Sequence, residues 1–177
     1  GFLHSLIDGH PQVSTLPGHY LAGFFSKDMW GLISSNRADE MIENFIDIYE
    51  ILFDAAAKSP LGFPIKNLGF NEGYTAMGWN RDQILQLDRK SFANNLNSLL
   101  AVNDKIDRSV FFKSIHLAYE QTLGRGKDHT HIFYHIHSPD NYGLLNYLNH
   151  FPETKLLMTV REPIQNLESW ISIAIDE

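Results

Sequence analysis

Apolar and polar residues follow one another in patterns that predict alternating helices and strands. Apolar positions at helical spacing predict helices at 2–8, 37–58, 81–100, 108–123 and 142–149. Shorter apolar runs that end at chain-breaking residues predict strands at 12–16, 130–138 and 156–160. The segment 59–80 is rich in Gly and Pro and predicts a loop. Strands separated by helices predict an α/β fold with a parallel sheet.

Composition narrows the classes of protein that fit this pattern. A chain of 177 residues that is 44% hydrophobic can bury the core of one domain, so we expect 1–177 to form a single domain. The net charge of −7 argues against a general nucleic-acid binder. Cysteine is absent, which excludes disulfides and cysteine-based metal or nucleophilic sites. No apolar run approaches the length of a membrane span, no signal peptide is visible, and the lack of an Asn-x-Ser/Thr site favours a cytoplasmic protein.

The segment 151–170 places an Arg and a Ser where they suit a phosphate group. The apolar run 156–160 ends at Arg161, and Pro163 suits the first turn of a following helix. Arg161 is therefore expected at the carboxyl end of a strand, where open parallel sheets bind ligands, and Ser169 about two turns up the helix. A guanidinium fork and a hydroxyl that converge there suit a phosphate. A surface Arg and a Ser on a helix face would give the same spacing.

Two segments resemble the sulfotransferases that use 3′-phosphoadenosine 5′-phosphosulfate (PAPS). FPETKLLMTVREP, with Ser169 beyond it, resembles their 3′-phosphate-binding segment, especially in the bacterial and tyrosylprotein branches. GFLHSLIDGHPQV resembles the helix after their phosphosulfate loop, with two apolar pairs and then His10-Pro11 at the family spacing. Gly1 matches the last position of that loop. The resemblance implies that the rest of the loop lies upstream and a second 3′-phosphate loop lies after Glu177, so the domain is expected to be incomplete at both ends.

The resemblance implies a fold, a reaction and a set of binding residues. The fold is a P-loop-NTPase-like three-layer structure with a central parallel sheet flanked by helices. The reaction moves a sulfuryl group from PAPS to a hydroxyl or amine of a small-molecule, glycan or protein acceptor, without a metal. Backbone amides of Gly1 and Phe2 would hold the 5′-phosphosulfate at the start of a helix. Arg161 and Ser169 would hold the 3′-phosphate.

A run of histidines is the second chemical feature of the sequence. On one continuous strand they would point to the same face as Phe133. The histidines that share this parity are His129, His131, His135 and His137. His-x-His pairs on a strand bind Zn²⁺ in some hydrolases, but no local spacing supplies a third ligand, and we expect no metal. Some of these histidines are alternatively packing or surface residues.

Two histidines are candidates for the general base. His137-Ser138-Pro139 resembles the His-x-Pro element of the family, whose His takes the acceptor proton in cytosolic members. Imidazole suits this role because its pKa lies near neutrality. The tyrosylprotein branch uses instead a Glu shortly after His-Pro, but the matching position here is about Gly18, beside His19. The base is therefore predicted to be His137 or His19.

Two further function classes stay open at this point. A P-loop kinase or NTPase shares the architecture but needs a Gly-x-x-x-x-Gly-Lys-Ser/Thr loop, and GFLHS does not contain its Lys-Ser/Thr. A non-catalytic binding module would keep the fold and lack the phosphosulfate loop. The residues that precede Gly1 in the full protein would distinguish these classes from a transferase.

Overall fold

Helices and short strands alternate in a computed structural model that describes residues 2–17, 21–57, 68–71, 73–125, 128–136, 141–157 and 164. The α-helices in this part of the chain are α1 (Phe2–Ile7), α2 (Met29–Ile33), α3 (Ala38–Ile48), α4 (Leu68–Asn71), α5 (Arg89–Leu100), α6 (Arg108–Thr122) and α7 (Asn141–His150). The 3₁₀ helices are η1 (Ala22–Phe25) and η2 (Glu50–Leu52), and the strands are β1 (Val13–Thr15) and β2 (His131–Phe133).

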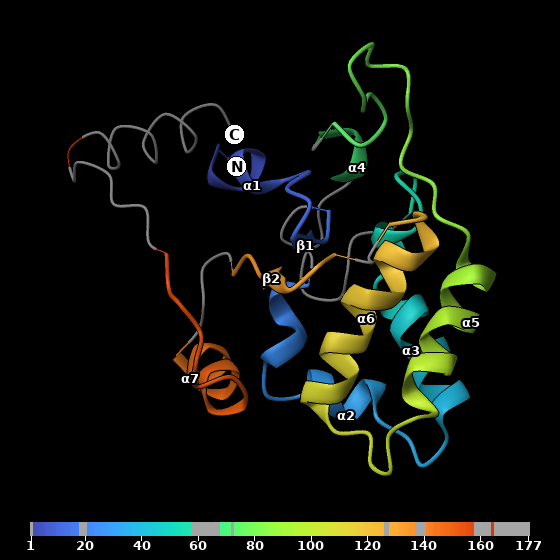
Figure 1. Cartoon of the computed structure of the whole chain (residues 1–177), viewed down its shortest axis with the longest axis vertical. Helices are drawn as coiled ribbons and strands as arrows, with labels where there is room; N and C mark the ends of the chain where they lie inside the picture. The colour runs from blue at the N-terminus through green and yellow to red at the C-terminus, as the bar shows by residue number, and fades with distance from the viewer. Residues whose placement is uncertain are drawn as a thin grey trace.

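The two strands pair in parallel, and helices cover both faces of the pair (Figure 1). Ser14 and its register partner Ile132 face the helical core and α6. Thr15 and its register partner Phe133 face α1, because neighbouring residues of a strand point to opposite sides. The prediction of an α/β fold with parallel strands is confirmed at this level, as a small parallel pair within a mixed chain. The three-layer P-loop-like architecture stays a prediction.

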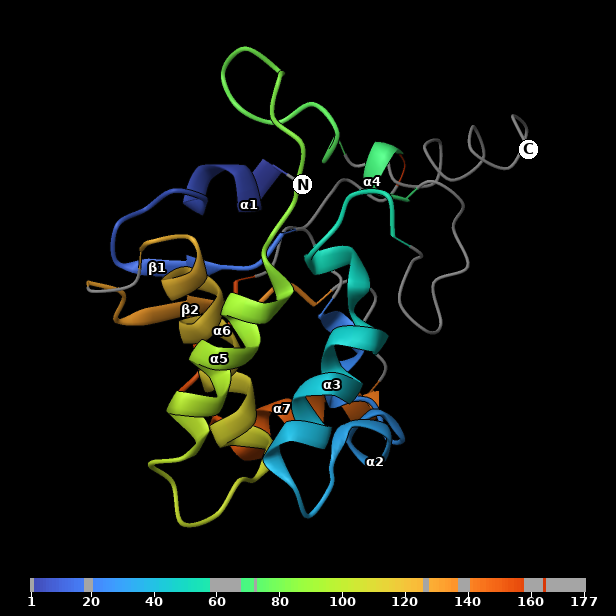
Figure 2. The ribbon, with the colours of Figure 1, turned by 90° about the vertical axis from the view of Figure 1, so that its right-hand side faces the viewer.

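A helical core lies on the α6 side of the strands. α5 packs against both α3 and α6 (Figure 2). Aromatic side chains dominate this core, and many of them meet edge to face, the arrangement that the ring quadrupoles favour. The largest fully buried ones are Phe24, Phe25, Phe45, Tyr49, Phe53, Phe92, Phe111, Phe112 and Tyr119. The Tyr119 hydroxyl donates to the carbonyl oxygen of Leu52 at 2.7 Å, so burying this hydroxyl leaves no unpaired donor.

Several predicted elements are confirmed with small changes in their ends. The helices predicted at 2–8, 108–123 and 142–149 are observed as α1, α6 and α7. The strand predicted at 12–16 is observed as β1. The strand predicted at 130–138 is shorter, since β2 ends at Phe133, and 137–138 lie outside the described residues.

The predicted helix 37–58 is too long, because α3 ends at Ile48 and the chain continues as η2. Tyr49 and the following residues 51–53 are all buried. A continuous α-helix would spread four such neighbours around its circumference, where they cannot all face one core. The chain instead leaves helical geometry at Tyr49, whose φ of −111° and ψ of 37° end the helix.

The predicted helix 81–100 begins eight residues late, at Arg89. The Asp88 side chain accepts a hydrogen bond from the Ser91 amide at 2.6 Å and caps the helix there. Before the cap, Leu85 and Leu87 are buried while their neighbours are exposed, which is the period of an extended chain. Residues 73–87 form a hairpin, here called the hairpin arm, which rises above the rest of the molecule (Figure 1).

The predicted buried strand 156–160 is wrong at its first two residues. Leu156 and Leu157 lie outside regular structure, 57% and 65% exposed, and 158–160 lie outside the described residues. Phe151 still packs against the aromatic core, and the chain then turns at Pro152. Within the described ranges no strand pairs with this segment. None of the described helices is both long enough and apolar enough to span a membrane.

Candidate functional site

Most of the predicted site residues lie outside the part of the chain that the structure describes. These residues are Gly1, His19, His137, Arg161 and Ser169. Phe2 is the first residue of α1. The structure describes the neighbours of two of these residues along the chain. α1 follows Gly1, and the end of β2 precedes His137.

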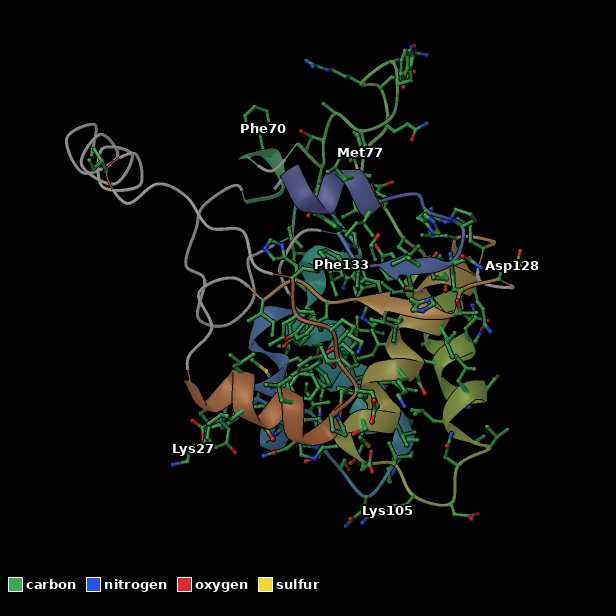
Figure 3. All side chains as sticks on the ribbon, turned by 60° about the vertical axis from the view of Figure 1, so that its left-hand side comes forward. Lys27, Phe70, Met77, Lys105, Asp128 and Phe133 are labelled. Atoms are coloured by element: carbon green, nitrogen blue, oxygen red, sulfur yellow. The ribbon has the colours of Figure 1, made fainter. Side chains whose placement is uncertain are left out.

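α1 meets the carboxyl end of β2 through a small cluster of rings, here called the α1–β2 junction: His4, Phe133 and His135. The His4 ring stacks on Phe133 with 5.8 Å between ring centroids and 15° between planes. The His135 ring lies 6.3 Å from His4. Phe133 lies below α1 in Figure 3. The first helix and the chain that leads to His137 are therefore neighbours in space.

Polar contacts hold α1 on this face of the strands. The Thr15 hydroxyl, at the end of β1, donates to the Asp8 carboxylate at 3.0 Å, just beyond the last residue of α1. Burial lowers the pKa of His4, and the nearby Asp8 charge opposes this shift. The half-buried His4 ring is therefore mainly neutral at pH 7, with a nitrogen able to accept a hydrogen bond.

Of the described histidines, His129 is the one for which the expectation of a shared face is wrong, whereas His131 has the parity of Phe133 within β2 and His135 lies with Phe133 near His4. β2 spans only His131–Phe133, and the alternation of sides holds only within the strand. His129 precedes the strand and lies on the α6 side, its Nδ1 3.8 Å from the Glu120 carboxylate. His131 is exposed and shares a hydrogen bond with the Thr130 hydroxyl at 2.8 Å, while His135 lies toward His4.

No three or more His, Cys, Asp or Glu side chains of the described residues come together as metal ligands. The separation of the histidines explains why, since His129, His131 and His135 each have different neighbours. The expectation that the protein binds no metal stays a prediction, because His137 and His19 are not among the described residues.

A buried hydrogen bond joins α6 to β1 on the opposite face of the strands. The Ser14 hydroxyl and His116 Nδ1 lie 3.1 Å apart, and both residues are 1% exposed. Burial alone lowers the pKa of His116 to about 3, so its ring is neutral at pH 7. Its Nε2 has no hydrogen-bond partner in the described residues. No solvent reaches this pair, so we assign it a role in fixing β1 on α6 rather than a role in chemistry.

A polar cluster around the buried Glu120 fixes the connection from α6 to β2, with Arg125 at its exposed edge. Glu120 is 2% exposed, and its carboxylate lies 3.4 Å from Arg125 Nε. His129 approaches the same carboxylate oxygen, and the Arg125 amide donates to the Glu120 carbonyl at 2.7 Å. Neither this cluster nor the Ser14–His116 pair is predicted by a local sequence pattern, because each depends on residues that are brought together only by folding.

Comparison of the chain with models of protein families, with curated proteins and with solved structures finds no match. The functional interpretation therefore depends on the two sequence segments and on the geometry of the α1–β2 junction.

Proposed function

We propose that the protein is a sulfotransferase that moves a sulfuryl group from PAPS to a hydroxyl or amine acceptor. The proposal starts from the two segments that resemble this family, at the start of the chain and at 151–170. We also propose the three-layer P-loop-like architecture, which is supported by a parallel strand pair with helices on both faces.

The observation that carries the proposal is the α1–β2 junction. A phosphosulfate held by backbone amides at the start of α1 must lie close to the base that takes the acceptor proton. Stacking of His4 on Phe133 brings α1 to the end of β2, and His135 is two residues from His137 along the chain. The arrangement supports a reaction centre between the start of α1 and the residues that follow β2.

The proposed chemistry is an in-line displacement at sulfur. The bond from sulfur to the phosphate oxygen of adenosine 3′,5′-bisphosphate breaks as a bond from sulfur to the acceptor oxygen or nitrogen forms. His137 takes the proton of the acceptor, and the backbone amides of Gly1 and Phe2 stabilise the charge that develops on the bridging oxygen. Arg161 and Ser169 hold the 3′-phosphate and so position the donor. A sulfuryl group carries less charge than a phosphoryl group, which is why no metal is assigned.

Isothermal titration of the full-length protein with adenosine 3′,5′-bisphosphate, with AMP and with ATP tests the proposal. We expect the bisphosphate to bind much more tightly, because only it carries the 3′-phosphate. Arg161→Ala should weaken its binding by about 1.5–3 kcal/mol, the range for a hydrogen bond to a charged group. Arg37→Ala is the matched control, since Arg37 is exposed and pairs with Asp39.

Two results would contradict the proposal. Equal affinity for AMP and the bisphosphate would remove the 3′-phosphate site. Tighter binding of ATP than of the bisphosphate would favour a P-loop kinase or NTPase instead.

A further inference from the structure

The hairpin arm carries the most exposed aromatic side chain of the described residues at its tip. Trp79 is 100% exposed. The arm is anchored at its base, where Leu85 and Leu87 are buried and hydrogen-bond to residues of the core segment 53–55. Figures 1 and 2 show the arm extending from the same end of the molecule as α1, with its tip free of other elements. Met77, labelled in Figure 3, lies lower on the arm.

The turn that presents Trp79 is held by backbone hydrogen bonds and special backbone angles. Met77 and Gln83 exchange two backbone hydrogen bonds, of 2.7 and 3.0 Å, which close the turn. Gly78 has φ of +79°, and an added Cβ would lie 2.7 Å from the Gln83 side chain. Arg81 has φ of +56°, an unfavourable region for a residue with a side chain. The turn therefore holds the indole away from the core at the cost of backbone strain at Arg81.

The residues beside the indole have a shared chemistry. Trp79 is followed by four exposed side chains that each end in a planar polar group: Asn80, Arg81, Asp82 and Gln83. Together they offer hydrogen-bond donors and acceptors close in sequence to an exposed apolar ring. The Arg and Asp charges offset one another, so the tip has no net charge. A ligand that fits has an apolar face, a rim of hydroxyl groups and little charge.

A pyranose ring has this chemistry, because its axial C–H groups form an apolar face and its equatorial hydroxyls form a polar rim. A membrane fits less well, since one Trp without a basic cluster binds lipid weakly and the chain has a net charge of −7. A protein partner fits less well too, because a specific interface buries about 800 Å² per partner and the tip offers one large apolar side chain. We propose that the tip of the hairpin arm is a carbohydrate-binding site, in which Trp79 stacks on the ring of an uncharged sugar.

This inference goes beyond the proposed transfer reaction and is tested by binding alone. Cellohexaose, chitohexaose and mannohexaose are titrated separately into ¹⁵N-labelled full-length protein. The signals of the indole N–H groups are followed by NMR, and the Trp79 signal is assigned by its loss in Trp79→Phe. We expect at least one hexasaccharide to shift the Trp79 signal in a saturable way. Trp79→Ala should weaken its binding at least about tenfold, the usual effect of removing a central aromatic contact.

The controls separate binding at the tip from other effects. Ile84→Ala removes another exposed apolar side chain of the same arm, 58% exposed, and should leave the affinity unchanged. The circular dichroism spectrum should be the same for all variants, because Trp79 makes no packing contact that its loss would disturb. The proposal is overturned if none of the three sugars shifts the Trp79 signal, if Trp79→Ala binds as well as the wild type, or if only phosphatidylcholine vesicles shift it.

Discussion

The His116 ring lies between α6 and β1, where water cannot hydrate its charged form. Its pKa is lowered to about 3 by burial, whereas the unfolded chain takes up the same proton near pH 6.5. Below pH 6.5 the unfolded state therefore binds more protons than the folded state, and the free energy of unfolding falls as the pH drops from about 6.5 toward 3. The contribution of this one group approaches about 1 kcal/mol per pH unit.

Urea denaturation at pH 7, 6, 5 and 4 measures this effect. We expect the free energy of unfolding of His116→Gln to change less steeply with pH than that of the wild type, because the titrating group is gone. His131→Gln removes an exposed histidine and should keep the wild-type slope. Equal slopes in wild type and His116→Gln would show that His116 does not titrate as burial requires.

His137 is the residue that we propose as the general base. We expect His137→Ala to lower the rate of sulfuryl transfer by roughly 10²–10⁴-fold, the usual share of general-base catalysis. Affinity for adenosine 3′,5′-bisphosphate should change little, because the base acts on the acceptor. The measurement is transfer from PAPS to a panel of phenols, sugars and amines, with His131→Ala as control. If His19→Ala abolishes turnover and His137→Ala does not, the base belongs to the segment after His10-Pro11.

Single residues differ in how far the sequence can predict their role. His137 and Arg161 stand in short motifs, so the adjacent residues are enough to make them candidates, and their roles stay predictions. His116 and Glu120 stand in a helical pattern that shows only which face is buried. Their partners Ser14 and Arg125 are set by the packing of α6 on β1 and by the turn after α6, which local sequence does not encode.

At the scale of elements, prediction succeeded where one period and a clear cap define a segment. α6 begins directly after Asp107 and keeps one buried face to its end, so its predicted ends agree with the observed ones. The predicted helices are too long after α3 and before α5 for the same reason. Their apolar residues belong to a 3₁₀ turn after α3 and to the strand-like hairpin arm before α5, not to a helix. In apolar runs of only a few residues, the spacing of a helix cannot be distinguished from that of an extended chain or a turn.

The Asp107 cap makes a prediction at this scale. Its side chain accepts a hydrogen bond from the Val110 amide at 2.9 Å and satisfies one of the free amides at the start of α6. Asp107→Ala should lower the free energy of unfolding by about 1 kcal/mol, as the loss of an N-cap usually does. Asp107→Asn should retain most of the stability, because its amide oxygen also accepts. Asp104→Ala is the control in the same loop, and an equal loss in Asp104→Ala would argue against the cap.

At the scale of the whole molecule, the alternation of the longer helices with two parallel strands could be predicted, but the short helix α2 and the helix α4 within the predicted loop 59–80 could not. A parallel pair forms from segments more than a hundred positions apart, with α1 on one face and α6 on the other. The apolar run that begins at Leu156 gave the same signal as the two observed strands, yet its first residues are exposed. Whether such a run forms a strand depends on a neighbouring sheet edge, which periodicity along the chain does not report.

The metal content of the whole protein gives the last prediction. We expect no stoichiometric zinc and sulfuryl transfer that survives EDTA, because a catalytic zinc site needs three converging protein ligands. His129 lies on the Glu120 side of the strands, His131 is exposed, and His135 lies at the α1–β2 junction, so these three do not converge. Elemental analysis of the full-length protein, purified without chelators, measures the metal. About one zinc per chain that is lost in His135→Ala or His137→Ala, but kept in His131→Ala, would instead favour a metal-dependent hydrolase.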